Sequence, residues 1–123
     1  MPALIIDDSE VTRAMLANIL KALGFEVLEA SDGCEGFRRL ASAKGLDLAL
    51  VDVFMPNMNG VDFVRAVRLQ PEWNHIRLMM VTADNELGSV AIALEAGANE
   101  YLMKPFDEAM ILEKLQLLGI GRC

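Results

Sequence analysis

The sequence predicts an α/β fold of three layers, in which a doubly wound, parallel five-stranded sheet carries helices on both faces. Three observations predict it. Short apolar runs recur at regular intervals, segments with a period near 3.6 residues lie between them, and several of the apolar runs are nearly continuous. Continuous apolar runs are typical of parallel strands buried on both faces. Regular alternation of strand and helix favours right-handed crossovers and helices on both sides of the sheet.

The strands are expected at five apolar runs. The first, third and fourth consist almost entirely of Ile, Leu, Val, Met and Ala, so we expect them in the middle of the sheet. The second and fifth contain Glu26, Glu29 and Glu100, and we expect them nearer to the edges. In chain order, the predicted strands are Ala3–Ile6, Phe25–Ala30, Leu46–Val51, Ile76–Val81 and Glu100–Met103.

The helices are expected in the segments between these runs and after the last one. The second helix has the clearest start, because Asp32 and Glu35 are spaced like a capping box. Glycines are expected to end the first, second and fourth helices. The helices are marked by Val11–Leu23 before Gly24, Phe37–Ala41 before Gly45, Val64–Val67, Leu87–Ala96 before Gly97, and a segment from about Asp107 that contains Ile111, Leu115 and Leu118.

Composition narrows the class of protein. The chain has 123 residues, of which 54% are hydrophobic, so residues 1–123 are expected to form one globular domain. Its formal charge of −7 argues against a nucleic-acid surface, which needs clustered Lys and Arg. No apolar run is long enough to cross a membrane, and the start does not resemble a signal peptide. Cys34 and Cys123 have no zinc-type spacing and are expected to be reduced in a cytoplasmic protein.

Polar residues gather where the predicted strands end. The first strand is followed by Asp7 and Asp8, the third by Asp52, the fourth by Thr82 and the fifth by Lys104. The carboxyl ends of parallel strands lie along one edge of the sheet, where open α/β sheets bind ligands. Taken singly, Asp8 or Thr82 could be a helix cap and Lys104 a solvated surface residue. Together, they are expected to meet in one pocket.

The residue types of this pocket indicate phosphoryl chemistry on a metal. Neighbouring carboxylates repel one another unless a cation compensates, and oxygen ligands without His or Cys favour Mg²⁺. Lys104 supplies a positive charge for a phosphoryl group, and Thr82 supplies a hydroxyl donor. Asp52 is then the best nucleophile, because carboxylates can form acyl phosphates. Phosphoryl transfer depends mainly on positioning and charge neutralisation, and this set of residues offers both.

Four motifs carry a resemblance to a known family. Ile5-Ile6-Asp7-Asp8-Ser9, the segment Asp52–Gly60, Val81-Thr82-Ala83 and Lys104-Pro105-Phe106 resemble the receiver domains of bacterial two-component response regulators. The motifs occur in the same order and spacing as in the family, and the match covers essentially the whole chain. The sequence is similar in particular to stand-alone chemotaxis regulators of the CheY type. The resemblance implies a flavodoxin-like (βα)5 fold with the strand order 2-1-3-4-5.

The resemblance also implies a role for each site residue. Asp52 would be the phosphoacceptor, while Thr82 and Lys104 would hold phosphoryl oxygens. Tyr101 matches the aromatic switch position, which turns inward when Thr82 moves toward the phosphate. The Lys104–Pro105 peptide bond would be cis, as in the family. The implied Mg²⁺ ligands are Asp8, Asp52 and the backbone carbonyl of Phe54, with Asp7 acting mostly through a water.

The partners follow from the same resemblance. A histidine kinase or a small phosphodonor would supply the phosphoryl group, and a downstream protein would bind the face of the fourth helix, fifth strand and fifth helix. The segment Glu86–Ala96 supports this expectation, because it has little polar face and so offers an apolar patch. The domain would catalyse only its own phosphorylation and dephosphorylation, as a monomer or a phosphorylation-linked dimer, with no nucleic-acid or membrane partner.

Three other interpretations account for part of the same sequence. An aspartate-nucleophile hydrolase would also need Asp52, Mg²⁺ and a lysine. Such enzymes generally carry a second carboxylate two residues after the nucleophile, where this chain has Phe54, and a cap domain that 123 residues cannot hold. A scaffold that keeps the fold without phosphorylation is disfavoured by the intact set of site residues. The chain could also be a receiver excised from a longer regulator.

Phe54 departs from the small or polar residue that is commoner two positions after the acceptor. A phenyl ring at the mouth of the pocket would obstruct the water that attacks the phosphoryl group in line. We therefore expect Phe54→Asn to shorten the lifetime of the phosphorylated form, measured as the decay of phosphoprotein after the donor is removed. An unchanged or longer lifetime would contradict this hypothesis.

Overall fold

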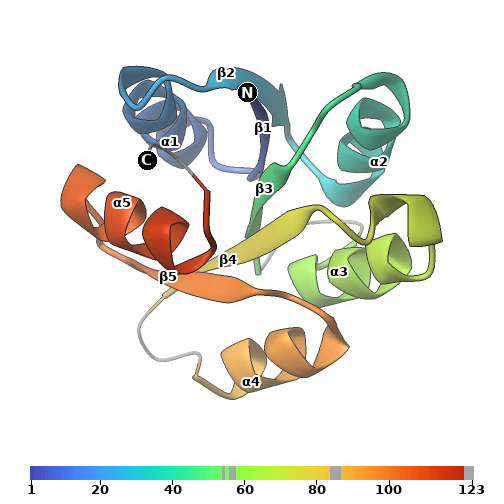
Figure 1. The fold of residues 1–123 in the computed structure, drawn as a ribbon. Helices are drawn as coiled ribbons and strands as arrows, with labels where there is room; N and C mark the ends of the chain where they lie inside the picture. Colours follow the sequence, from blue (N-terminus) through green and yellow to red (C-terminus); the bar gives the residue numbers. More distant parts are fainter. Residues whose placement is uncertain (54, 56–57, 84–86, 121–123) are drawn as a thin grey trace.

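The computed structural model describes residues 1–53, 55, 58–83 and 87–120. These residues form a parallel five-stranded sheet with helices on both faces (Figure 1). The strand order is β2-β1-β3-β4-β5, so the predicted fold and order are confirmed. The strands are β1 (Pro2–Ile6), β2 (Glu26–Ala30), β3 (Leu48–Asp52), β4 (Arg77–Ala83) and β5 (Glu100–Lys104).

The helices divide unevenly between the two faces of the sheet. Helices α1 and α5 cover one face, and α2, α3 and α4 cover the other (Figure 1). A short 3-10 helix, η1, precedes β4 and was not predicted. The bounds are α1 (Glu10–Ala22), α2 (Gly33–Ser42), α3 (Gly60–Arg68), η1 (Pro71–Trp73), α4 (Leu87–Ala96) and α5 (Glu108–Leu117).

The central strands are buried on both faces, which explains their continuous apolar sequence. All residues of β3 are buried, and successive side chains point to opposite faces, as strand geometry requires. Leu48 and Leu50 pack toward α1 and α5, whereas Ala49 and Val51 pack toward the other three helices. The edge positions predicted for β2 and β5 are confirmed, and both strands are only partly buried.

Local signals account for the ends of α2, with one correction. The Asp32 side chain accepts a hydrogen bond from the Glu35 amide at 2.8 Å, and the Glu35 carboxylate accepts one from the Ser31 amide at 2.7 Å. The predicted cap at Asp32 is therefore confirmed, whereas Glu35 reaches back to Ser31, the residue before the cap, and not to the cap residue as in a standard capping box. The prediction that the helix runs to Gly45 is wrong, because Ala43 is already extended. Gly45 instead takes a φ of 74° in the loop that leads to β3.

The described residues contain no helix that is long and apolar enough to span a bilayer. Cys34 is a free, exposed thiol on α2, and Cys123 lies outside the described residues.

Arg68, at the end of α3, connects segments that are distant in sequence. Its guanidinium donates hydrogen bonds to the backbone carbonyls of Gly97 at 3.0 Å, Trp73 at 3.0 Å and Ile76 at 2.7 Å, and to the Asn99 side chain at 2.9 Å. The side-chain oxygen of Asn99 also accepts the amide at the start of β4. One side chain therefore joins α3, η1, β4 and the turn between α4 and β5.

We expect Arg68→Met to lower the free energy of unfolding by about 3 kcal/mol, because it leaves several partly buried carbonyls without their donor. Urea denaturation measures the change. Arg65→Met on the same helix is the matched control: Arg65 is 56% exposed and pairs with exposed Asp62. The control is expected to change stability by less than about 0.5 kcal/mol. Equal effects of the two variants would contradict the assigned role of Arg68.

Candidate functional site

The candidate site lies at the point where the strand order reverses. Strands β1 and β3 are neighbours in the middle of the sheet, and the chain leaves them toward helices on opposite faces. Such a reversal opens a crevice at the carboxyl ends of the strands. Asp7 and Asp8 follow β1 directly, and Asp52 is the last residue of β3. The fold therefore brings the three predicted carboxylates to one place.

The carboxylates are close enough to share a ligand. Asp7, Asp8 and Asp52 each offer an oxygen atom, and these atoms lie within 4.8 Å of one another. Asp7 has no exposed surface, Asp52 is 7% exposed and Asp8 is exposed, so the group opens to solvent on the side of Asp8. From the end of β5, the Lys104 Nζ atom lies 3.8 Å from Asp52 Oδ1.

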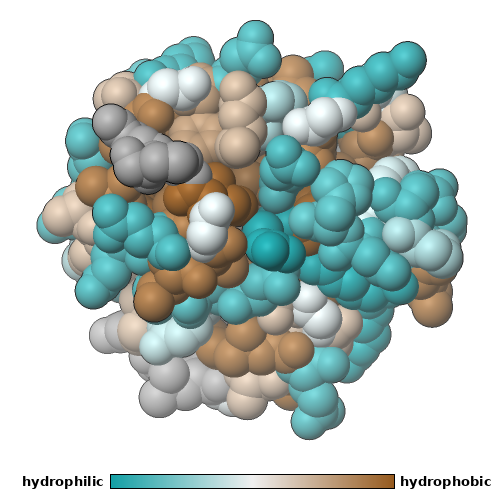
Figure 2. Space-filling model, in the orientation of Figure 1, coloured by the Kyte–Doolittle hydropathy of each residue, from teal (hydrophilic) through white to brown (hydrophobic). Residues whose placement is uncertain are grey.

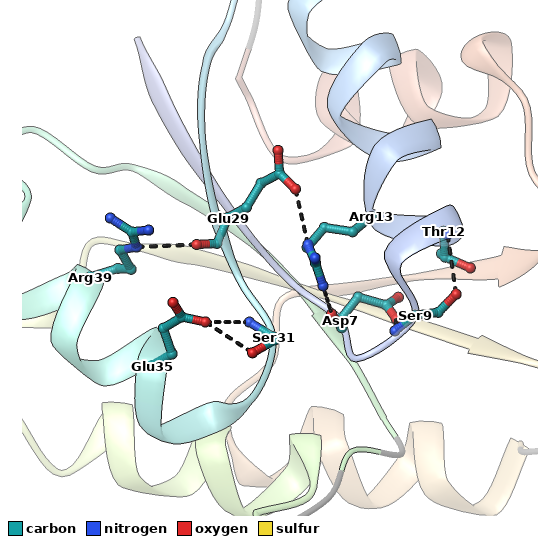
Figure 3. Close-up of polar contacts among 8 residues, drawn as sticks. All are labelled: Asp7, Ser9, Thr12, Arg13, Glu29, Ser31, Glu35 and Arg39. Atoms are coloured by element: carbon teal, nitrogen blue, oxygen red, sulfur yellow. Dashed lines mark hydrogen bonds and ion pairs between the residues drawn. The ribbon is translucent and has the colours of Figure 1, made fainter.

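Asp7 is held firmly but keeps one carboxylate oxygen unused. Its Oδ1 atom accepts a hydrogen bond from the Ser9 amide at 2.8 Å (Figure 3), and its own amide donates to the Ala30 carbonyl at 3.1 Å. Its Oδ2 atom is buried and has no hydrogen-bond partner among the described residues. A buried polar atom without a partner is costly, and an ion or water bound between the carboxylates would satisfy it.

Burial raises the pKa values of both Asp7 and Asp52. Burial, reinforced by the negative charge of Asp7, raises the pKa of Asp52 to about 7, although Lys104 acts in the opposite direction. Burial also raises the pKa of Asp7, and the hydrogen bond from the Ser9 amide partly counters it. A cation that binds here would stabilise the ionised forms of both groups.

The donor set fits a hard divalent cation. All three candidate ligands are carboxylate oxygens, and the group includes no His or Cys. Oxygen donors of this kind suit Mg²⁺, which takes few carboxylates and keeps several waters. The exposed side near Asp8 leaves room for those waters. The residues present are therefore compatible with the predicted magnesium site.

Thr82 and Tyr101 lie on strands beside the carboxylates. Asp52 pairs in register with Val81, so Thr82 lies one residue further along β4, where it is 2% exposed. Tyr101 pairs with Met80, and residues two apart on a strand share a face, so Thr82 and Tyr101 face the same side of the sheet. The Lys104–Pro105 peptide bond that follows β5 is cis.

The glycine that begins α3 has a structural role that was not predicted. The Gly60 amide donates a hydrogen bond to the Val53 carbonyl at 2.8 Å, and a Cβ atom at this position would collide with the Asp52 carbonyl oxygen. Only a residue without a side chain lets α3 start so close to the end of β3. The signal was available, because Gly60 belongs to the motif that follows Asp52.

One further expectation concerns the loop after Asp52. Phe54, whose backbone carbonyl was predicted to bind the metal, lies outside the described residues. Met55 and Met58 are partly buried and pack against the core on the side of α2, α3 and α4. The N-cap of α1 is Ser9, whose side chain accepts the Thr12 amide at 3.2 Å, so Asp8 does not serve as the cap.

Comparisons with known proteins agree with the fold. A family model for the response regulator receiver domain matches residues 3–116. Chemotaxis protein CheY1 of Helicobacter pylori is 37% identical over 119 residues, which are 96% of either chain. The solved structure of chemotaxis protein CheY4 of Vibrio cholerae superposes with a TM-score of 0.87 at 34% identity, over 94% of this chain and 96% of that one. A probable two-component response regulator/GGDEF domain protein superposes with a TM-score of 0.90 at 26% identity; the chain covers 48% of it.

The raised pKa of Asp52 predicts the pH dependence of stability without metal. Between about pH 4, where an unfolded aspartate titrates, and about pH 7, the native state binds a proton that the unfolded state has lost. The free energy of unfolding therefore falls as the pH rises through this window. We expect Asp52→Asn to stabilise the metal-free protein by roughly 2–4 kcal/mol at pH 8 and by little at pH 4.

Urea denaturation in EDTA at the two pH values measures this difference. Glu72→Gln, which neutralises an exposed carboxylate on η1, is the control and is expected to show no such pH dependence. If Asp52→Asn had the same effect at both pH values, the carboxyl group would not be strained in the native state.

Proposed function

Because the chain belongs to the response regulator receiver domain family, we propose that Asp52 accepts a phosphoryl group and that the domain signals through the resulting change of its surface. The observation that carries the proposal is the convergence of three carboxylates within 4.8 Å, with the Lys104 ammonium 3.8 Å from Asp52. This is the arrangement that phosphoryl transfer to a carboxylate needs: a nucleophile, ligands for a cation and a fixed positive charge.

Asp7, Asp8 and Asp52 would hold the Mg²⁺ ion, together with the backbone carbonyl of Phe54. A bound Mg²⁺ neutralises the phosphoryl oxygens and keeps the carboxylates ionised at neutral pH. The unpartnered Oδ2 atom of Asp7 supports this assignment, because it would be satisfied by a magnesium-bound water.

In the proposed transfer, an Asp52 carboxylate oxygen forms a bond to phosphorus as the bond from phosphorus to the donor breaks. The donor's leaving group departs with the bonding electrons. Lys104 binds a phosphoryl oxygen in place of the Asp52 oxygen, and the Thr82 hydroxyl, which donates to the Ala83 carbonyl at 3.3 Å, turns to donate to another. A histidine kinase or a small phosphodonor is the proposed source. The domain would act on itself only, and not as an enzyme for a separate substrate.

The switch would run from Thr82 to Tyr101. Both residues face the same side of the sheet, toward α4, so a movement of the Thr82 hydroxyl changes the space that is available to the ring. Tyr101 is half-buried, which leaves it room to move inward or outward. The proposed consequence is a change of shape on the surface formed by α4, β5 and α5.

That surface has an apolar component to offer a downstream protein. Ile92 is 50% exposed and Leu94 is 40% exposed on α4. Figure 2 shows hydrophobic surface over the place that α4 occupies in Figure 1. We propose that this face binds the output protein, in the cytoplasm and without nucleic acid or membrane, with the domain acting as a monomer or as a phosphorylation-linked dimer.

Incubation with acetyl phosphate and Mg²⁺ tests the acceptor directly. We expect intact-protein mass spectrometry to show one phosphate adduct, and we expect Asp52→Ala and excess EDTA each to lower its yield at least tenfold. Asp62→Ala is the matched control, because it removes an exposed carboxylate from α3 and should leave the yield unchanged.

The result separates the alternative functions. Turnover of external phosphoesters without a stable adduct would favour a hydrolase. A protein that binds no Mg²⁺ and forms no adduct would favour a scaffold, and the proposal would then be wrong.

A further inference from the structure

A second polar cluster is hydrogen-bonded to the backbone of Asp7, and the proposed chemistry does not use it. We call it the Arg13 bridge; it consists of Arg13 on α1 and Glu29 on β2 (Figure 3). The Arg13 Nε atom donates to Glu29 Oε1 at 3.0 Å, and its Nη1 atom donates to the Asp7 carbonyl oxygen at 2.6 Å. The Arg13 side chain is only 15% exposed.

The bridge completes the restraint on Asp7. Three hydrogen bonds hold this residue: its amide donates to Ala30, its carbonyl accepts from Arg13 and its Oδ1 atom accepts from Ser9. The backbone on both sides of the Asp7 side chain is therefore fixed, and so is the direction of the free Oδ2 atom. Because Asp7 has no exposed surface, loss of the Arg13 donor would leave its carbonyl unsatisfied and favour a displaced backbone.

Glu29 explains how a cation can be tolerated beside a cation site. An arginine near the carboxylates would by itself oppose the binding of Mg²⁺, because like charges repel. Glu29 offsets part of that charge and also orients the guanidinium toward the Asp7 carbonyl. Glu29 is positioned in turn by Arg39 of α2, whose Nε atom donates to the Glu29 carbonyl at 3.1 Å. The Arg13–Glu29 pair therefore has no net formal charge, while its guanidinium has a fixed orientation toward the Asp7 carbonyl.

We propose that Arg13 and Glu29 are positioning residues for the magnesium site: they act through the Asp7 backbone and not through their charge. The inference rests on the proposed function, because it concerns the ion that this function requires. Mg²⁺ demands nearly ideal octahedral geometry from its waters as well as from its protein ligands, so a small displacement of Asp7, which would hold a magnesium-bound water, weakens binding. Partners that orient metal ligands typically contribute tenfold or more to affinity.

Whether Mg²⁺ binding becomes tighter or weaker in bridge variants distinguishes a positioning role from a charge effect. Removal of the arginine charge alone should tighten Mg²⁺ binding, whereas loss of the bridge should weaken it. The double variant Arg13→Met/Glu29→Gln removes both charges and leaves the net charge unchanged. We expect it to weaken Mg²⁺ binding about tenfold in isothermal titration calorimetry, and we expect Arg13→Met alone to weaken it as well. Arg13→Lys, which keeps a donating ammonium but not the two separate nitrogens that reach Glu29 and Asp7, should fall between these variants and the parent.

The matched control is Asp62→Asn/Arg65→Met, which neutralises an exposed ion pair on α3 and should leave binding unchanged. Circular dichroism and thermal melts establish that each variant is folded; if the double variant is not, Arg13→Lys carries the test. A second measurement is the rate of acetyl phosphate labelling. The Mg²⁺ concentration for half-maximal rate should rise about tenfold, while the rate at saturating Mg²⁺ stays within about twofold of the parent.

Two outcomes overturn the inference and are distinguishable. If the parent binds Mg²⁺ and the folded bridge variants bind it within about twofold, or more tightly, the residues do not position the site, but the proposed function stands. If the parent itself binds no Mg²⁺, the proposed function fails and the inference fails with it.

Discussion

The constraint on which the rest of this structure depends is the enforced proximity of like-charged carboxylates. Asp7 and Asp52 are buried beside each other at the ends of two central strands, where burial and the negative charge of Asp7 raise the pKa of Asp52 to about 7. The apolar sheet holds them there, because β1 and β3 are fully packed from both faces. The Lys104 ammonium and the Ser9 amide offset part of the repulsion. The repulsion that they leave uncompensated would favour the binding of a cation, as proposed for Mg²⁺.

The sequence predicted the fold and the composition of this site for the same reason. Continuous apolar runs identify central parallel strands, and the residue that ends each run lies at a known edge of the sheet. The convergence of Asp7, Asp8 and Asp52 therefore follows from chain topology, without any knowledge of side-chain conformations. Lys104 follows by the same rule, since it ends β5 and reaches Asp52 across the edge.

The parts that were missed depend on tertiary geometry. Nothing in the residues around Arg13 indicates that it will reach back to the Asp7 carbonyl while it pairs with Glu29, sixteen residues away. Arg68 likewise finds most of its partners across loops whose paths are set only by the completed fold. The end of α2 was predicted from Gly45, yet the helix ends at Ser42, because a glycine signals a positive φ and not which turn will use it. Local rules identify candidates, whereas packing decides between them.

Contacts at the free edge of β5 connect the strand that carries Lys104 and Tyr101 with helix α5. Glu100 Oε1 accepts both the Tyr101 amide at 3.0 Å and the Lys114 ammonium at 3.2 Å, so side chains of the same domain occupy a position where another chain could pair with the edge strand. The same ammonium lies 4.2 Å from the centre of the Tyr101 ring, a favourable cation–π distance. One lysine of α5 therefore both covers the strand edge and stabilises the present position of the ring. If phosphorylation rotates Tyr101, as proposed, the ring would move away from the Lys114 ammonium, and the charge and shape of the face next to α4 would then change together.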